Sequence, residues 1–147
     1  MADLDDLARR SADFMWADDA ASRMLGMKIV AVGPGTATVS MAVREDMING
    51  WGLCHGGLVA SLADSAFAVA CNSHGEVTLA AGFDVSFLDA ARLGDELVAV
   101  ASERVLRGRS GVYDVTVRRA GDDSVMAEFR GRSRSTGNRN PGVQPGS

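Results

Sequence analysis

The chain has 147 residues, of which 46% are apolar and 23% charged, and a formal net charge of −4. These values are typical of one globular domain and exclude a fibrous or wholly disordered protein. The acidic balance and the 5% aromatic content argue against a nucleic-acid partner, and the absence of an uninterrupted membrane-spanning apolar stretch argues against a membrane partner.

The first third of the chain predicts a helix followed by two strands. Residues 3–25 carry a loose apolar stripe among Asp and Arg, which is typical of an amphipathic helix. A short strand is expected at 27–32, and the alternating, β-branched residues 36–43 predict a second strand beyond a Gly-Pro-Gly turn. Residues 44–54 show no clear period, so we expect a loop there.

The rest of the chain predicts a buried helix and four more strands. The helix begins at His55-Gly56-Gly57 and is expected to end near residues 72–75. The strands, which are separated by short turns, are expected at 77–88, 96–107, 111–119 and 124–132. Because short connections favour antiparallel pairing, we expect an α+β domain over residues 1–135 with a curved, mainly antiparallel sheet around the apolar helix. Residues 136–147, rich in Gly, Asn and Pro, are expected to form a disordered tail.

A single carboxylate interrupts the longest apolar segment. Asp64 is the only Asp, Glu, Lys or Arg between Met47 and Gly75. An ionised carboxylate in apolar surroundings costs several kcal/mol unless it is paired or takes part in chemistry. The pattern alone leaves two interpretations open: a carboxylate that caps or pairs across an interface, and a catalytic one.

The spacing between Asp64 and the start of its helix leaves two possibilities: the two groups are unrelated, or they form one site that is built from two chains. His55 and Asp64 are nine residues apart, which corresponds to about 13 Å of helix rise and about two and a half turns. Their side chains should therefore point in opposite directions. If the site is built from two chains, a two-fold dimer can place Asp64 of one chain opposite residues 55–57 of the other. A helix start offers free N–H groups to a carbonyl, so the pair has the components for acyl transfer or hydrolysis.

The segment from Asn49 to Ser73 resembles the hotdog-fold acyl-CoA thioesterases, and in particular their phenylacetyl-CoA thioesterase branch, PaaI. It reads Asn-x5-His-Gly-Gly-x6-Asp followed by Ser, at the spacing of that family. The helix end Ala-Cys-Asn-Ser at residues 70–73 is similar to that branch, and residues 111–114 and 129–131 resemble its later strands. The similarity covers about residues 14–135.

This resemblance implies a fold, an activity and a set of site residues. The fold has a long central helix wrapped by a sheet of about five or six strands, with an additional N-terminal helix in this chain. The reaction is hydrolysis of an acyl-CoA, such as phenylacetyl-CoA or hydroxyphenylacetyl-CoA. It needs no metal or cofactor, since CoA is part of the substrate. The resemblance also implies a homodimer with two interface sites, commonly paired into a homotetramer. The implied roles are nucleophile or general base for Asp64, carbonyl-polarising N–H donor for Gly56, positioning of carbonyl or water for Asn49 and His55, and a neighbouring hydroxyl for Ser65.

The basic C-terminal part of the chain gains interest from the resemblance, because CoA in this family lies along the surface with its phosphates outside. Residues 104–147 carry nine Arg and four acidic residues. On charge alone, arginines on the solvent faces of strands are the simpler interpretation. The residues expected to bind substrate are Gly57, Arg107, Arg109, Arg132 and Arg134.

Several alternatives stay open. The same fold could carry out hydration or dehydration of an acyl thioester, or bind acyl-CoA without catalysis. Some relatives place a Ser in the strand after the helix to orient the water, whereas alanines occupy the matching positions within residues 78–82. That departure leaves room for another assistant or for direct attack by Asp64.

The two cysteines are expected to be reduced thiols without a catalytic role. Cys54 precedes His55, but adjacent side chains rarely point the same way, which argues against a Cys–His nucleophile. Cys71 lies in the apolar helix and is expected to be a core residue. The acidic N-terminus lacks the features of a signal peptide, and with these thiols it predicts a cytoplasmic protein.

Overall fold

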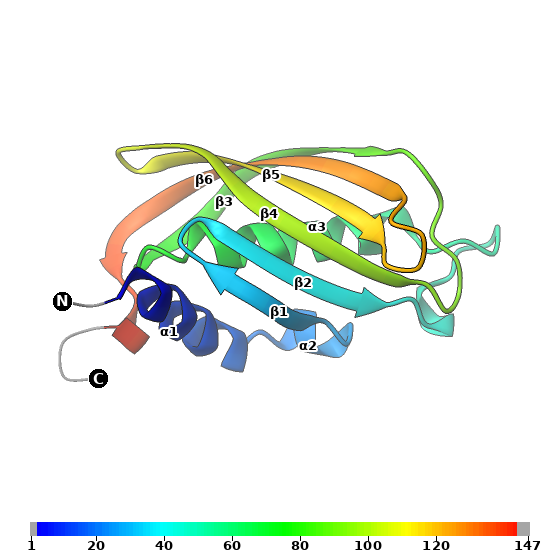
Figure 1. Ribbon diagram of the computed structural model, residues 1–147, viewed down its shortest axis with the longest axis horizontal. Helices are drawn as coiled ribbons and strands as arrows, with labels where there is room; N and C mark the ends of the chain where they lie inside the picture. The colour runs from blue at the N-terminus through cyan, green and yellow to red at the C-terminus, as the bar shows by residue number, and fades with distance from the viewer. Residues whose placement is uncertain (1–2, 144–147) are drawn as a thin grey trace.

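Six strands form one antiparallel sheet that curls around a central helix, as seen in the computed structural model, which describes residues 3–143 (Figure 1). The helices are α1 (Leu4–Ala17), α2 (Ala20–Met24) and α3 (Gly56–Cys71), with short 3-10 helices at Glu45–Met47 and Pro141–Val143. The strands are β1 (Lys28–Gly33), β2 (Thr36–Ala42), β3 (Glu76–Phe87), β4 (Glu96–Arg107), β5 (Ser110–Arg119) and β6 (Val125–Arg139).

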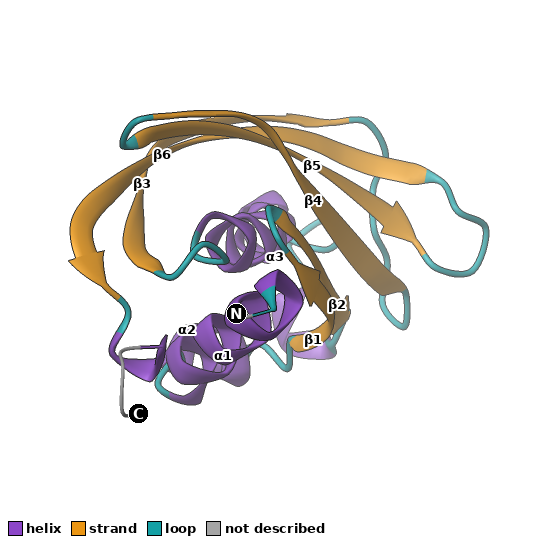
Figure 2. Cartoon of the chain, turned by 60° about the vertical axis from the view of Figure 1, so that its left-hand side comes forward, coloured by secondary structure: helices purple, strands orange, loops and turns teal. Residues whose placement is uncertain are grey.

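The strands are arranged in the order β1-β2-β4-β5-β6-β3, so β1 and β3 form the two edges of the sheet. Every pair is antiparallel. Figure 2 shows the sheet as an arch with α3 beneath it and α1 and α2 on the open side. The expected α+β architecture, with its central helix and six strands, is therefore confirmed.

The core lies between α3 and the concave face of the sheet, and Phe67 is at its centre. Phe67 is fully buried, and its ring centroid lies 5.6 Å from that of Tyr113 and 5.8 Å from that of Phe129. The same ring packs on Gly131 of β6, where a Cβ would come within 2.8 Å of it. Gly131 thus provides the space that a large aromatic residue needs beneath the sheet.

The most apolar helix, α3, has 16 residues. Within the part of the chain that the structure describes, no helix combines the length and apolar character needed to cross a membrane.

The N-terminal helical region differs from its prediction, because it is divided into α1 and α2. The break falls at Asp18 and Asp19, where the Asp19 carboxylate accepts a hydrogen bond of 3.0 Å from the Ser22 N–H and caps α2. Asp is among the strongest N-cap residues. The apolar stripe continues across the break, so periodicity alone does not reveal it.

The predicted tail from residue 136 is wrong for residues 136–143. Thr136 continues β6, and its hydroxyl donates to the Val77 carbonyl at 2.8 Å. Beyond the strand, the Asn140 N–H donates to the Gly75 carbonyl at 2.8 Å, and the Asn140 side chain donates to the Ser11 carbonyl. These long-range partners order a segment whose composition is typical of a loop. Residues 144–147 lie outside the described residues.

Candidate active site

Two backbone N–H groups at the start of α3, those of Gly56 and Gly57, belong to residues that line cavities. His55 is the N-cap residue, and its carbonyl accepts hydrogen bonds from the N–H groups of Leu58 and Val59 at 2.9 and 3.3 Å. The N–H groups of Gly56 and Gly57 have no acceptor among residues 3–143. Free donors of this kind at a helix start favour a carbonyl oxygen or a negative charge.

Gly56 lines a cavity of about 300 Å³ with an apolar wall. The ring of Phe87 at the end of β3 lies beside it, since a Cβ on Gly56 would be 3.2 Å from Phe87 Cζ. The other lining residues are Asn49, Leu53, Cys54, Val59, Leu88, Asp89, Ala90 and Ala91. A ligand carbonyl can therefore reach the Gly56 N–H while an apolar group contacts the surrounding wall.

Asn49 shares the Gly56 cavity but has a structural role as well. Its Oδ1 accepts hydrogen bonds from the N–H groups of Trp51 and Leu53, at 2.9 and 3.1 Å. The carboxamide oxygen thereby shapes the loop, as an Asn-Gly turn signal indicates. The Nδ2 group remains to donate to a ligand, so Asn49 can assist Gly56 as a hydrogen-bond donor.

His55 and Gly57 line a different cavity, of about 220 Å³, together with residues 46–48 and Leu58. The His55 imidazole is exposed and makes no hydrogen bond within the described residues. Its backbone N–H donates to the Met47 carbonyl at 2.8 Å, which anchors the start of the helix. In one chain, His55 therefore contributes mainly through its backbone.

Asp64 lines a third cavity, of about 210 Å³, between α3 and α2. It is half-buried, and within residues 3–143 its carboxylate has no hydrogen bond or ion pair. Burial raises the pKa of the Asp64 carboxyl above its ordinary value, and the negative charge of Asp19 raises that pKa further. A half-buried carboxylate without a partner is well suited to accept a proton.

Two residues of this cavity, Asp19 and Ser22, were missed by sequence reasoning. The Ser22 hydroxyl donates to Asp19 Oδ2 at 2.7 Å and lies 2.7 Å from the Ser65 hydroxyl. The pattern Asp-x-x-Ser at 19–22 signals a helix cap, but nothing in the sequence indicates that this cap contacts the central helix. The residues lining the cavity are Asp19, Ala21, Ser22, Leu25, Met27, Ser61, Asp64, Ser65 and Ala68.

A single chain does not bring the predicted catalytic residues together. Gly56 and Asp64 lie eight residues apart on one continuous helix, which corresponds to about 12 Å along its axis. They line separate cavities that share no residue. The structure therefore agrees with the separation predicted from the spacing.

Three of the four predicted phosphate-binding arginines gather at one pocket. Arg107, Arg132 and Arg134 line a cavity of about 470 Å³ at the β4–β5 turn, with Val105 and Val112 among its apolar walls. Arg132 pairs with Asp84 at 2.9 Å and Arg134 donates to the Ser110 hydroxyl at 3.3 Å, whereas Arg107 has no such partner within residues 3–143. Arg109 does not line the pocket, and its guanidinium donates to the Thr136 carbonyl.

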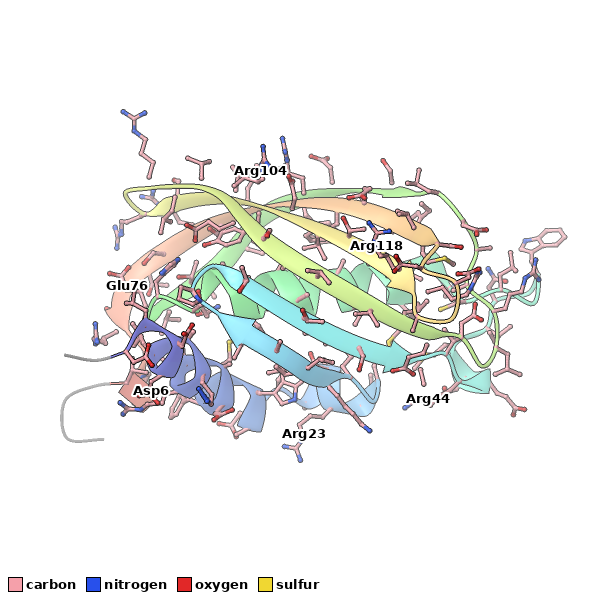
Figure 3. All side chains as sticks on the ribbon, viewed as in Figure 1. Asp6, Arg23, Arg44, Glu76, Arg104 and Arg118 are labelled. Atoms are coloured by element: carbon pink, nitrogen blue, oxygen red, sulfur yellow. The ribbon has the colours of Figure 1, made fainter. Side chains whose placement is uncertain are left out.

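Other arginines on the outer face of the sheet are already paired. Figure 3 shows Arg104 and Arg118 on this face. Arg104 lies 3.4 Å from the Asp114 carboxylate, which also pairs with Arg130 at 2.7 Å. These ion pairs lower the pKa of Asp114, with the hydrogen bond from Arg130 as the largest cause. The solvent-face interpretation therefore applies to these arginines.

The cysteine thiols are unsuited to nucleophilic attack. Cys54 and Cys71 are both free and buried. Burial raises the pKa of the Cys54 thiol, and burial also raises that of Cys71 to about 12. A thiolate is the reactive form, so neither is a nucleophile here. Among residues 3–143, no group of three or more His, Cys, Asp or Glu is arranged to hold a metal ion.

Comparison with known proteins places the chain in a family. Residues 52–126 match the thioesterase superfamily. The chain is 39% identical to the acyl-coenzyme A thioesterase PaaI of Escherichia coli K12 over 130 residues, which cover 88% of this chain and 92% of that protein. The solved structure of E. coli PaaI, described as a protein of the phenylacetic acid degradation operon, superposes with a TM-score of 0.91 at 38% identity, over 93% of this chain and 99% of that one.

A second solved structure supports the same grouping. A variant of the phenylacetic acid degradation protein PaaI from Thermus thermophilus matches with a TM-score of 0.76 and 33% identity, over 79% of this chain and 98% of that one. The chain has the hotdog fold, and the class of enzyme is the thioesterases. The chain belongs to the thioesterase superfamily and is similar to its PaaI branch. The resemblance drawn from residues 49–73 is thus confirmed, as is the expected enzyme class.

Proposed function

We propose that the protein hydrolyses acyl-CoA thioesters to a free acid and CoA, in sites shared between two chains. The observation that carries the proposal is the pair of complementary half-sites on α3. Within residues 3–143, one has the free N–H of Gly56 beside an apolar cavity, and the other has the unpartnered carboxylate of Asp64. Similarity to the E. coli acyl-coenzyme A thioesterase PaaI supports the same substrate class.

The chemistry follows from these two groups. The thioester carbonyl oxygen accepts from the Gly56 N–H, with Asn49 Nδ2 as a second donor, so that negative charge developing on this oxygen is stabilised. Asp64 of the second chain removes a proton from water, whose oxygen attacks the carbonyl carbon. Alternatively, Asp64 attacks that carbon itself and forms a mixed anhydride, which water then hydrolyses to the free acid and the regenerated carboxylate. The C–S bond breaks, and the thiolate of CoA takes up a proton. A thioester has a good leaving group, so a carboxylate and one or two donors suffice.

The edge strand β3 supports pairing of two chains. It is 12 residues long and none of its residues is buried. Leu79, Phe83 and Phe87 are 59%, 41% and 51% exposed. A long apolar edge of this kind favours pairing with another strand. We propose a homodimer formed through β3, with a homotetramer as the larger assembly.

Two-fold pairing through β3 also explains the position of the arginine pocket. In Figure 1 the β4–β5 turn lies at the left end of the molecule and the start of α3 lies toward the right end. An edge strand paired with its own copy by a two-fold axis runs antiparallel to it. The partner's pocket of Arg107, Arg132 and Arg134 would therefore approach the Gly56 end of the first chain. We propose that this pocket binds the phosphates of CoA while the acyl group occupies the Gly56 cavity.

The proposed acyl group is an aryl one, phenylacetyl or hydroxyphenylacetyl. The support is the similarity to phenylacetic acid degradation proteins and the apolar wall of Phe87, Leu88 and Val59 beside Gly56. The two free, buried cysteines suit a reducing cytoplasm.

The test is a panel of acyl-CoA esters scored by thiol release, comprising phenylacetyl-, hydroxyphenylacetyl-, octanoyl- and crotonyl-CoA. We expect the aryl esters to give the highest kcat/KM, and Asp64→Asn to reduce it by about a hundredfold or more, or about 2.7 kcal/mol of barrier. Asp18→Asn, which removes an exposed carboxylate outside the site, is the matched control. Crotonyl-CoA turnover without thiol release would instead indicate a hydratase, and tight binding without turnover a binding module.

A further inference from the structure

The hydroxyl chain from α2 to α3 has a defined direction. Asp19 Oδ1 accepts from the Ser22 N–H at 3.0 Å, and Asp19 Oδ2 accepts from the Ser22 hydroxyl at 2.7 Å. An ionised carboxylate only accepts hydrogen bonds, and a serine hydroxyl has a single proton. The one proton of Ser22 is therefore directed to Asp19.

This direction determines the role of Ser65. The hydroxyl oxygens of Ser22 and Ser65 lie 2.7 Å apart, so one of them donates to the other. Because the proton of Ser22 is already used, Ser65 is the donor. Its hydroxyl then presents only lone pairs to the cavity that it lines with Asp64.

We infer that Asp19 and Ser22 are positioning residues that keep Ser65 as a hydrogen-bond acceptor beside Asp64, so that the two side chains together hold the attacking water. This inference rests on the proposed hydrolysis and deepens it. One O–H of the water donates to Asp64 and the other to Ser65, which directs an oxygen lone pair toward the thioester carbon. The first proton moves to Asp64 as the C–O bond forms, and it is returned to the CoA thiolate when the C–S bond breaks.

The arrangement favours general-base catalysis over direct attack by Asp64. A water molecule has two protons to donate, so it can use both the Asp64 carboxylate and the Ser65 oxygen as acceptors. Direct attack by Asp64 would need no second acceptor. The Ser65 oxygen also provides the assistant that the alanines within residues 78–82 do not. The position of Ser22 suits a fixed relay, since this residue is only 3% exposed and its hydroxyl makes both contacts.

Asp19→Asn tests the relay without removing the cap, because Asn is as good an N-cap as Asp. The Asn amide can accept from the Ser22 N–H through its oxygen and donate to the Ser22 hydroxyl through its nitrogen. Ser22 would then donate to Ser65, whose own proton would turn toward Asp64 and compete with the water. Asp18→Asn removes the same charge one residue earlier, from an exposed carboxylate outside the relay.

The kinetic readout is kcat for the best acyl-CoA at a pH where Asp64 is ionised. We expect Ser65→Ala and Asp19→Asn each to lower kcat by about tenfold, or about 1.4 kcal/mol, with KM nearly unchanged and Asp18→Asn at the wild-type rate. The Asp19→Asn/Ser65→Ala double variant should lose no more than Ser65→Ala alone. Multiplicative losses in the double variant, or a kcat within about twofold of wild type for Asp19→Asn, would overturn the relay.

A second readout does not depend on turnover, so it separates this inference from the proposed function. The Asp64 carboxyl is titrated by carbon NMR in the same variants. Among the described residues, Asp19, the N-cap of α2, and Cys71 of α3 are the titratable groups that interact electrostatically with Asp64. The titration midpoint of Asp64 should fall in Asp19→Asn. It should recover in part in Asp19→Asn/Ser65→Ala, since residue 65 then has no hydroxyl to donate to Asp64. Equal midpoints in these two variants would overturn the relay, whereas absence of thiol release by the wild type would overturn only the proposed hydrolysis.

Discussion

The ring of Phe87 lies so close to Gly56 that a Cβ on this glycine would be 3.2 Å from Phe87 Cζ. Phe87 ends the edge strand, and Gly56 opens the central helix. The contact therefore links two proposed functional features. One is strand β3, which is proposed to pair two chains, and the other is the Gly56 N–H, which is proposed to bind the thioester carbonyl. Glycine at this position lets the Phe87 ring approach the helix start closely, so that both residues line the same cavity.

Gly56→Ala is expected to lower activity with little effect on stability. The added methyl group would press against Phe87 and crowd the space over the N–H, so kcat/KM should fall by at least about tenfold. The contact is with the far edge of one side-chain ring and not with backbone, which limits the cost to folding. Thiol-release kinetics and thermal unfolding measure the two effects. Gly50→Ala is the control, since a Cβ there meets nothing within 4 Å, and an equal loss in both variants would contradict the role of Gly56.

Asp64→Asn should stabilise the protein at neutral pH while it strongly reduces turnover. The folded-state pKa of Asp64 is raised, so this group favours folding fully below its unfolded pKa of about 4, and that contribution is lost as the pH rises through the folded pKa. Above that pH, the half-buried ionised carboxylate lowers the free energy of unfolding, and Asn removes this destabilising charge. Urea unfolding of both proteins between pH 4 and pH 8 should show an advantage for Asn that grows with pH. A variant less stable than wild type at pH 8 would contradict this account.

Sequence patterns predicted most of this fold because its elements are regular. The alternating strands and the apolar run at residues 57–71 are local signals, and the structure confirms them. The contact of Asp19 with the central helix, the β6 pairing beyond residue 135 and the gathering of Arg107 with Arg132 depend on tertiary packing. Local composition carries no information about such packing, so the sequence does not distinguish Arg109, which donates to the Thr136 carbonyl, from the arginines that line the pocket.

Gly131→Ala tests the packing at the centre of the core. Its Cβ would come within 2.8 Å of the Phe67 ring, and overpacking of this kind typically costs about 1–3 kcal/mol. Phe67→Ala should cost about 3–5 kcal/mol, because it leaves a cavity beneath the sheet. In the double variant the cost should be less than the sum, since the ring that clashes is gone. Additive values from denaturant unfolding would contradict the contact.

Arg107→Gln should weaken binding of the nucleotide part of the substrate. We expect KM for acyl-CoA to rise by about three- to tenfold with kcat unchanged, because the Arg107 guanidinium, which has no partner within residues 3–143, is available to a phosphate. An acyl-pantetheine, which lacks the nucleotide phosphates, should show no change. Arg109→Gln is the matched control, since Arg109 donates to the Thr136 carbonyl instead. Equal effects on both substrates would place the phosphates elsewhere.

The most direct test of the shared site is to mix two inactive proteins. Asp64→Asn supplies an intact Gly56, and Gly56→Val supplies an intact Asp64. In a mixed dimer one of the two sites has both wild-type residues. After random exchange of equal amounts, about half of the dimers are mixed, so activity should recover to about a quarter of the wild-type value. If the mixture stays as inactive as its two components after exchange is verified by mass spectrometry, the site does not span two chains.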